Sequence, residues 1–396
     1  MTTNNEWLQR YSDSILGVFG TPPLVLSHGD GCYVWDVDGR RYLDLVGGIA
    51  VNALGHGHPA MVSAVSKQAS EALHISNLFT SPGQVLLAER LLEISGAPAG
   101  SRVFFGNSGA EAIEASIKLA RRTGRTGIVA AEHAFHGRTT GALALTHKAA
   151  YREPFEPLLP GVTHVPYDDT DALRDAVNET TSAVVLEPVQ GEAGVIAPAV
   201  DFLREARDIT RAAGALLIID EIQTGIGRTG TWFGFQHAGI VPDAITLAKG
   251  LGGGVPIGAM VTFGPDVSAL LTAGQHGTTF GGNPLAAAAG LAVLGAIEEE
   301  GLLDHAQRMG EHLESAVAAA DIPHVTGVRG QGLLRAITLD GPISAAVATA
   351  ARDAGFIINP VAPEAIRLAP PLVIQAEQLD ALVSALPDII QEATEE

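Results

Sequence analysis

The sequence is poor in cysteine and in positive charge. Its 396 residues include one cysteine, Cys32, and 24 Lys and Arg against 44 Asp and Glu, which gives a formal net charge of −20. A single cysteine excludes an internal disulfide and is typical of a reducing compartment, so we expect a cytoplasmic location. The negative charge repels phosphate backbones, which argues against nucleic acid as a partner.

The sequence also lacks an apolar run long enough to cross a bilayer. Its most apolar long stretch, residues 284–297, is rich in alanine and glycine and falls short of the about 20 residues that a membrane helix needs. The N-terminus is polar and does not have the basic-then-apolar layout of a signal peptide. We therefore expect no membrane partner and a chain large enough for more than one domain.

Lysine is scarce, and its scarcity bears on catalysis. Three of the four lysines, Lys67, Lys118 and Lys148, lie in helical or polar stretches that are typical of a protein surface. Lys249 differs because it follows the apolar run 243–248 and enters a glycine-rich segment. Chemistry that needs a buried amine therefore points to Lys249.

Short apolar runs alternate with helical patterns through the middle of the chain. The runs span residues 101–105, 126–132, 182–187, 215–220, 243–248 and 257–263. Continuous apolar runs are typical of strands covered on both faces, as in a mainly parallel sheet flanked by helices. Ligands of such sheets bind beyond the carboxyl ends of the strands, so the residues after each run are candidates for a site.

The two ends of the chain predict a smaller α/β unit. Helical patterns cover residues 284–299, 302–320, 343–353 and 376–394, with strand-like runs at 332–339 and 365–370. Residues 32–45 predict a hairpin with positive φ angles at Asp38-Gly39, and we expect it to pack with the small unit. The predicted division is an N-terminal segment (1–56), a large domain (57–286) and a small domain (287–396).

The segment after the run 215–220 matches two nucleotide-binding patterns, and both interpretations fail. Residues 225–230 match G-x-G-x-x-G, but four residues separate them from the predicted strand and no helical period follows. Asp220-Glu221 is similar to the acidic strand end of a nucleotide hydrolase. However, none of the four lysines lies in a G-x-x-x-x-G-K-[ST] loop.

Polar residues at the predicted strand ends form a different set. Residues 106–111 join a strand to a helix, which presents N–H groups and a helix dipole to a phosphate, although Ser108 to Glu111 is also a capping box. Residues 133–138 hold two histidines without a further metal ligand at suitable spacing. Phe135 suits either core packing or the face of a planar ring. Asp220 needs a partner because it follows a buried run.

Pyridoxal phosphate (PLP) is a cofactor that uses all of these groups. Its aldehyde needs a lysine, and its pyridine nitrogen needs a carboxylate that keeps it protonated. Its phosphate needs a helix N-terminus and its ring an aromatic face. Lys249, Asp220, residues 106–111 and Phe135 supply these groups. We therefore predict a PLP enzyme without a metal site.

With these residues placed, the chain resembles the class III aminotransferases from about residue 20 to its C-terminus. The blocks that carry the resemblance are residues 105–121, 134–139, 186–195, 216–259, 277–286 and 366–374. The resemblance implies the type I fold of PLP-dependent transferases, with a large domain and a smaller α/β domain. It also implies a homodimer whose active site is shared between the subunits.

The resemblance assigns roles residue by residue. The residues that it places on the cofactor are Ser108, Gly109, Ala110, Phe135, Asp220, Gln223, Lys249 and Thr279. The first three would hold the phosphate, Phe135 the ring, and Gln223 the ring hydroxyl. Thr279 would reach the phosphate of the cofactor in the partner subunit. Lys249 would bond the aldehyde and move the proton during catalysis.

The resemblance also implies how the substrates bind. Arg138 would hold the distal carboxylate, and Arg367 the carboxylate beside the reacting carbon of glutamate. Glu192 would pair with Arg367 while the other substrate, which lacks that carboxylate, reacts. The chain is most similar to the members that transfer the terminal amino group of N2-acetyl-L-ornithine to 2-oxoglutarate in arginine biosynthesis.

The identity of the amino donor has alternatives. Gly48 and Phe19 stand where ornithine-specific members carry tyrosines, and the loss of those hydroxyls fits an acylated donor. Ornithine, succinylornithine, succinyldiaminopimelate and 4-aminobutyrate remain alternatives. An aminomutase of the same fold is more distant, and a non-catalytic ligand-binding relative would be expected to lack Lys249.

Overall fold

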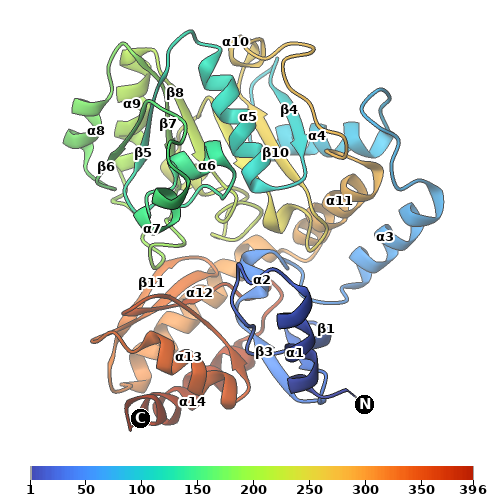
Figure 1. The fold of residues 1–396 in the computed structure, drawn as a ribbon, viewed down its shortest axis with the longest axis vertical. Coiled ribbons are helices and arrows are strands. Elements are labelled where there is room, and N and C mark those ends of the chain that lie inside the picture. Colours follow the sequence, from blue (N-terminus) through green and yellow to red (C-terminus); the bar gives the residue numbers. More distant parts are fainter. Residues whose placement is uncertain (1, 396) are drawn as a thin grey trace.

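The chain folds into two lobes, which Figure 1 shows one above the other. The computed structural model describes residues 2–395. The upper lobe holds a seven-stranded sheet flanked by helices, and the lower lobe holds two four-stranded sheets with helices beside them (Figure 1). Within the described residues, no helix is both long enough and apolar enough to span a membrane.

The upper sheet is mainly parallel, as the apolar runs predict. Its order is β4-β10-β9-β8-β7-β5-β6, and β10 runs antiparallel to both of its neighbours. The strands are β4 (Arg102–Gly106), β5 (Gly127–Ala131), β6 (Val162–Val165), β7 (Thr181–Leu186), β8 (Leu216–Asp220), β9 (Ala244–Leu247) and β10 (Gly258–Thr262). The sequence did not predict β6, since this edge strand is short and only one of its residues is fully buried.

Alternate residues of the central strands enter two separate cores. In β5, Ile128 and Ala130 pack on one face of the sheet, whereas Val129 and Ala131 pack on the other. Helices α5 (Gly109–Arg121) and α6 (Thr140–Leu145) cover the first face; α4 (Pro82–Ile94), α9 (Phe202–Ala213) and α11 (Pro284–Glu299) contribute to the second core. Burial on both faces explains why the strands are continuous apolar runs.

The lower lobe combines the two ends of the chain. One sheet has the order β1-β2-β3-β13, formed by β1 (Leu26–Asp30), β2 (Tyr33–Asp36), β3 (Arg41–Asp44) and β13 (Phe356–Ile357). The other has the order β11-β12-β15-β14, formed by β11 (Val325–Gln331), β12 (Leu334–Leu339), β14 (Asn359–Ala362) and β15 (Ala365–Leu368). Because β3 pairs with β13, the N-terminal hairpin shares a sheet with the C-terminal residues. The division at residues 56 and 286 stays a prediction.

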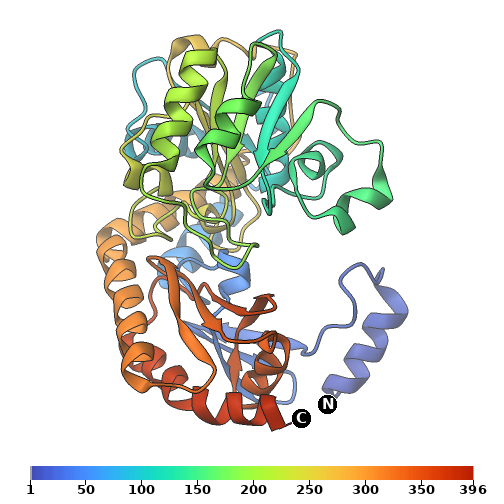
Figure 2. The same cartoon turned by 90° about the vertical axis from the view of Figure 1, so that its left-hand side faces the viewer.

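The remaining helices are distributed over both lobes. They are α1 (Asn4–Ser14), α2 (Gly47–Ala50), α3 (Pro59–Glu71), α7 (Ala149–Arg152), α8 (Thr170–Ala176), α10 (Pro265–Ser268), α12 (Leu302–Ala320), α13 (Ser344–Asp353) and α14 (Ala376–Glu395). In Figure 2, α1 stands away from the lower lobe. This position agrees with its burial, since α1 has no buried residue.

The turn of the N-terminal hairpin differs from the prediction. Four residues connect β2 to β3, because β2 ends at Asp36 and β3 begins at Arg41. Gly39 has a φ of 88°, but Asp38 does not take a positive φ. The Asp36 carboxylate accepts hydrogen bonds from the backbone N–H groups of Asp38 and Arg40 at 3.0 and 2.8 Å. These two bonds hold the longer turn, so the two-residue turn predicted at Asp38-Gly39 is wrong.

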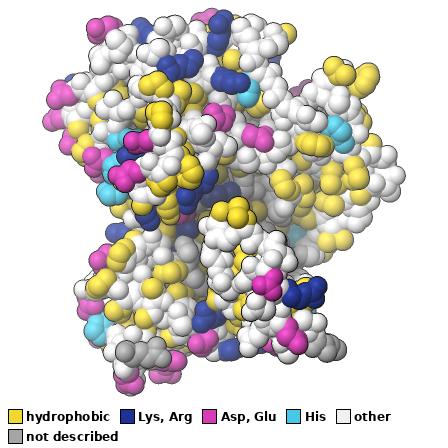
Figure 3. Space-filling model, viewed as in Figure 1, with side chains coloured by type: hydrophobic (Ala, Val, Ile, Leu, Met, Phe, Trp, Pro, Cys, Tyr) yellow, Lys and Arg dark blue, Asp and Glu magenta, His cyan; other side chains and the backbone are white. Residues whose placement is uncertain are grey.

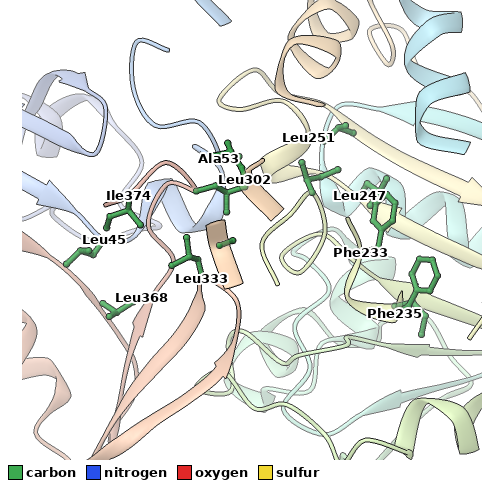
Figure 4. Packing of buried hydrophobic residues seen from close by; sticks show 14 of the residues in the cluster. Leu45, Ala53, Phe233, Phe235, Leu247, Leu251, Leu302, Leu333, Leu368 and Ile374 are labelled. Atoms are coloured by element: carbon green, nitrogen blue, oxygen red, sulfur yellow. The ribbon is translucent and has the colours of Figure 1, made fainter. Parts of the chain in front are cut away.

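One hydrophobic core runs through both lobes. The same cluster of buried side chains includes Leu45 and Leu368 of the lower lobe and Phe233 and Leu247 of the upper lobe (Figure 4). Burial of this kind stabilises a fold by about 25 cal/mol for each Å² of apolar surface removed from water. The continuous core fixes the lobes against each other where the candidate site lies.

Candidate active site

A cavity of about 380 Å³ opens at the carboxyl ends of the upper-lobe strands. Its lining includes residues in the segments that follow β4, β5, β7, β8 and β9, together with Val51 beside α2. The site therefore lies where the rule for parallel sheets predicts it. Figure 3 shows several Lys and Arg side chains in the hollow between the two lobes, on a chain with a net negative charge.

Lys249 lies in the wall of this cavity, in the segment that follows β9, with Ala248 between it and the strand. Its backbone φ of 43° is unusual for a residue with a side chain and indicates local strain. Burial lowers the pKa of Lys249 from its ordinary 10.5 to about 8, although the negative charge of Glu192 opposes the change. An amine with this pKa can give up or take a proton near neutral pH.

Asp220 ends β8 and is held from two sides. Its Oδ2 lies 2.6 Å from Nδ1 of His136, and its Oδ1 accepts hydrogen bonds from Oγ1 of Thr246 at 3.2 Å and the N–H of Ile222 at 3.0 Å. Burial disfavours a charged His136, but the hydrogen bond and negative charge of Asp220 outweigh it and raise the pKa of the imidazole. The imidazole of His136 therefore lies behind the Asp220 carboxyl group at the cavity wall.

The N-terminus of helix α5 forms another wall of the cavity. Ser108 is the N-cap of α5, and its Oγ accepts a hydrogen bond from the N–H of Glu111 at 3.2 Å. The N–H groups of Gly109 and Ala110, in the first turn, have no acceptor within the helix and are available to an anion. A Cβ at Gly109 would come within 2.7 Å of Ile222, so glycine permits the close packing of this turn against the segment that follows β8.

The predicted capping box at Ser108 is only half formed. In a full box the Glu111 carboxylate would accept from the N–H of Ser108. Instead Oε2 of Glu111 accepts from the backbone N–H and the side-chain amide of Asn107, at 2.7 and 2.8 Å. The Glu111 side chain thus satisfies Asn107 and leaves the N-terminal turn open to the cavity.

Arg367 and Glu192 form an ion pair between the lobes. Nη1 of Arg367 donates to Oε1 of Glu192 at 2.5 Å and to Oε1 of Gln223 at 3.2 Å, and Nη2 donates to Oδ1 of Asn359 at 2.8 Å. Arg367 is 2% exposed, whereas the Glu192 side chain is 36% exposed. Burial raises the pKa of Glu192, but the charge of Arg367 outweighs it and holds the pKa below its ordinary value.

The cavity fits PLP by the chemistry of its donor set. It presents a buried amine, a buried carboxylate backed by an imidazole, a helix N-terminus and the ring of Phe135. Each group matches one part of the cofactor, namely its aldehyde, pyridine nitrogen, phosphate and ring. Among the described residues, no group of three or more His, Cys, Asp and Glu side chains is placed to hold a metal ion.

Comparisons with known proteins agree with this geometry. The model of the family "Aminotransferase class-III" matches residues 19–390. The chain is 53% identical over 392 residues to the acetylornithine aminotransferase of Mycobacterium tuberculosis H37Rv, covering 99% of this chain and 98% of that protein. It is 52% identical over 394 residues to the protein of that name from Streptomyces coelicolor, covering 99% and 97%.

Solved structures give the same result. The ornithine aminotransferase of Toxoplasma gondii has a TM-score of 0.93 at 30% identity and covers 100% of this chain and 96% of that chain. The acetylornithine aminotransferase of Elizabethkingia anophelis has a TM-score of 0.88 at 33% identity, covering 99% and 100%. This chain belongs to the class III aminotransferases. The predicted resemblance and the predicted fold are confirmed.

The class III fold brings most of the predicted site residues together. The predicted residues that line the cavity are Ser108, Gly109, Ala110, Phe135, Glu192, Asp220, Gln223 and Lys249. Arg367 contacts this set through Glu192 and Gln223. Their catalytic and binding roles stay predictions.

Other predicted residues of the class III site lie outside the cavity. Thr279 is exposed and does not line the cavity, although its neighbour Thr278 accepts a hydrogen bond from the lining residue Asn107 at 3.1 Å. Arg138 is exposed beside Phe135. Phe19, which is 88% exposed, and Gly48 do not line the cavity either. Within one chain, Phe19 and Gly48 therefore give no information about the amino donor.

Sequence reasoning missed two residues of this class III site. His136 had been considered only as a metal ligand, and Glu187 only as a residue at a strand end. Glu187 lines the cavity, and burial raises the pKa of its carboxyl group to about 8. A signal for both was present, since each lies in a segment that follows a buried parallel strand, but the sequence does not show which side chains converge on Asp220.

Proposed function

We propose that this chain transfers the terminal amino group of N2-acetyl-L-ornithine to 2-oxoglutarate. The products would be N-acetylglutamate 5-semialdehyde and L-glutamate, a step of arginine synthesis. The observation that carries the proposal is the full-length likeness, at 53% identity, to proteins named acetylornithine aminotransferase. The cavity supports it because Lys249, Asp220 and the Glu192–Arg367 pair lie together around one space.

PLP, when bound, supplies an aldehyde that takes an amine and a ring that accepts electrons. Lys249 would hold the aldehyde, Asp220 the pyridine nitrogen, and the first turn of α5 the phosphate. Phe135 would contact the ring, and Gln223, beside Arg367, would reach the ring hydroxyl. A cytoplasmic location, expected from the single cysteine, belongs to the same proposal.

Lys249 is suited to move protons in this cavity. Its pKa of about 8 leaves part of the amine unprotonated at neutral pH, and the remainder can act as an acid. The cavity wall excludes bulk water from most of the side chain, which limits the exchange of its proton with solvent. One residue can therefore serve as base and then as acid in each half of the reaction.

The Glu192–Arg367 pair addresses a problem of two unlike substrates. 2-Oxoglutarate and glutamate carry a carboxylate beside the reacting carbon, whereas the terminal amine of N-acetylornithine does not. Glu192 occupies the Arg367 guanidinium in the structure, so the positive charge is matched when no substrate carboxylate is present. Because Glu192 is 36% exposed, its side chain can move toward solvent when a substrate carboxylate takes its place.

A homodimer is the assembly that we propose. Large apolar side chains are exposed on the N-terminal segment and near residue 280. The exposed residues include Leu16, Val18, Phe19, Leu78, Phe79 and Phe280. Large exposed apolar side chains of this kind support a protein interface. A second copy would cover these side chains, and Thr279, which does not line the cavity of its own chain, would reach the cavity of the partner.

The proposed function is tested with two readouts. PLP added to the protein should produce the visible absorbance of a lysine-bound cofactor, and that absorbance should be absent from a Lys249→Ala variant. N-acetylornithine, ornithine, succinylornithine and 4-aminobutyrate are then added separately without a keto acid. Fastest loss of the absorbance with N-acetylornithine supports the proposal. Faster loss with any other donor would assign a different aminotransferase, and no absorbance with PLP would contradict the cofactor itself.

A further inference from the structure

Arg138 is held by an aromatic ring rather than by a carboxylate. Its Cζ lies 3.5 Å from the centroid of the Tyr151 ring and 5.7 Å from that of Phe135. No ion pair of Arg138 is found within residues 2–395, on a chain with 44 acidic residues. Arg138 directly follows the lining residue Gly137, and its guanidinium lies beside the ring of Phe135, which also lines the cavity.

The segment that carries Tyr151 is fastened to the same strand exit as Arg138. The N–H of His147 donates to the carbonyl of Ala134 at 2.9 Å, and Nε of Arg152 donates to the carbonyl of His147 at 3.2 Å. Tyr151 itself is half-buried in the short helix α7, and its N–H donates to the carbonyl of Lys148. These bonds place the ring on a supported backbone.

A ring and a carboxylate hold an arginine in different ways. A carboxylate occupies the in-plane N–H donors of the guanidinium, which are the same donors that a substrate carboxylate needs. The face of an aromatic ring attracts the charge through its π-electrons and leaves those donors free. The Lys148 ammonium lies 4.7 Å from the centroid of the same ring and keeps additional positive charge nearby.

We propose that Tyr151 is a positioning residue that holds the Arg138 guanidinium open for the distal carboxylate of the substrates. This inference rests on the proposed function, in which Arg138 binds that carboxylate. It adds Tyr151 to the site and explains why the N–H donors of Arg138 are free. Arg367 must exchange its partners between half-reactions, whereas Arg138 binds a carboxylate in both and is kept free by Tyr151.

The test compares Tyr151→Leu and Tyr151→Phe in the full-length, PLP-loaded protein. Calorimetry measures the Kd of glutarate, a dicarboxylate that does not react. Single-turnover absorbance measures the half-reactions of L-glutamate and L-norvaline, which share their reacting end while only glutamate has a distal carboxylate. Tyr33→Leu is the matched control, because Arg41 packs over the Tyr33 ring at 4.6 Å outside the cavity.

Tyr151→Leu should raise the Kd of glutarate by about three- to tenfold and slow the glutamate half-reaction by a similar factor. Tyr151→Phe keeps a ring face, so the glutarate Kd and the glutamate rate should stay within about twofold of wild type. The rate of the norvaline half-reaction should stay within about twofold in every Tyr151 variant. In an Arg138→Gln background, Tyr151→Leu should have no further effect. If Tyr151→Leu lowers the melting temperature, Tyr151→Met removes the ring by a second route.

Two results would overturn the positioning role. One is an unchanged glutarate Kd in both ring-removing variants, and the other is an equal loss for glutamate and norvaline. Failure of the proposed function gives a different result, since wild-type protein would then convert another amine faster than N-acetylornithine, or convert none of them. The two failures are distinguishable because glutarate binding requires no turnover.

Discussion

The two lobes contribute unlike groups to one cavity. The upper lobe contributes Lys249 and Asp220 at the ends of strands that are fixed by ladder hydrogen bonds. The lower lobe contributes Arg367, whose guanidinium is held by side chains, including Glu192 from the opposite lobe. A strand end keeps its position, whereas an ion pair between side chains can exchange partners. We call Lys249 and Asp220 the fixed wall of the cavity, and Arg367 with Glu192 the exchangeable wall. The fixed wall suits the steps common to both half-reactions, and the exchangeable wall suits the step in which the substrates differ.

Removing Lys249 should have the largest effect on the turnover rate. Lys249→Ala takes away the amine that the fixed wall supplies, so we expect the turnover rate to fall by about 10⁴-fold or more. Steady-state assay of glutamate formation measures it, with Lys67→Ala as a control on an exposed helix. A Lys249→Ala enzyme that keeps more than about 1% of the wild-type rate would contradict the role.

Asp220→Asn is a milder substitution in the fixed wall. The amide keeps the shape of the side chain but loses the carboxylate that contacts His136 and that, in the proposed site, would face the pyridine nitrogen of the cofactor. We expect the turnover rate to fall by about 10²- to 10³-fold, as for the loss of one preorganised electrostatic group. Asp208→Asn, at a solvent-exposed acid, is the control. An Asp220→Asn enzyme within about threefold of wild type would show that the carboxylate charge is dispensable.

Glu192→Gln tests the exchangeable wall. Without the carboxylate, the charge of Arg367 is unmatched when N-acetylornithine binds, so that half-reaction should slow by about tenfold, a value reduced by the partial exposure of Glu192. The glutamate half-reaction should change by less than about twofold, because its own carboxylate binds Arg367. Single-turnover absorbance compares the two, with Glu205→Gln as the control. Equal slowing of both half-reactions would show that Glu192 does not act selectively in the step where the two substrates differ.

The fixed wall was predictable from the sequence, whereas most of the exchangeable wall was not. Continuous apolar runs predicted the central strands, because burial on both faces leaves no polar alternation. The carboxyl-end rule then placed Lys249 and Asp220 at one edge of the sheet. Neither step needs a contact between distant segments to be known, which is why both could be made from the residues alone.

Side-chain partners across long sequence separations could not be read in the same way. Arg367 and Glu192 were paired only through the family resemblance, and Asn359 was not considered. His136 was missed because a histidine after a strand carries no mark of which carboxylate it will meet. The hairpin turn failed for a local reason, since the Asp36 carboxylate stabilises a longer connection than the Asp38-Gly39 pattern predicts.

Glu221 differs from its neighbour Asp220 in the surroundings of its carboxylate. It follows Asp220 directly, but its carboxylate faces away from the cavity and accepts from Oγ1 of Thr224 at 2.5 Å and from the N–H groups of Gly234 and Phe235 at 2.9 and 2.7 Å. Burial raises the pKa of Glu221 from 4.5 to about 7 in spite of these bonds. The Asp220 carboxylate thus lies at the site, whereas the adjacent Glu221 carboxylate lies in the core.

The raised pKa of Glu221 predicts a pH dependence of stability with a definite sign. The folded state holds this proton more tightly, so the contribution is complete below about pH 4.5 and is lost as the pH rises through about 7. Between these values the free energy of unfolding of wild type should fall by roughly 2 kcal/mol more than that of Glu221→Gln, as measured by urea denaturation of the cofactor-free protein. Turnover of the loaded variant should stay within about twofold, because the side chain does not line the cavity. Parallel pH profiles for the two proteins would show that Glu221 is ionised in the core throughout, and a large loss of turnover would show that the two carboxylates act together.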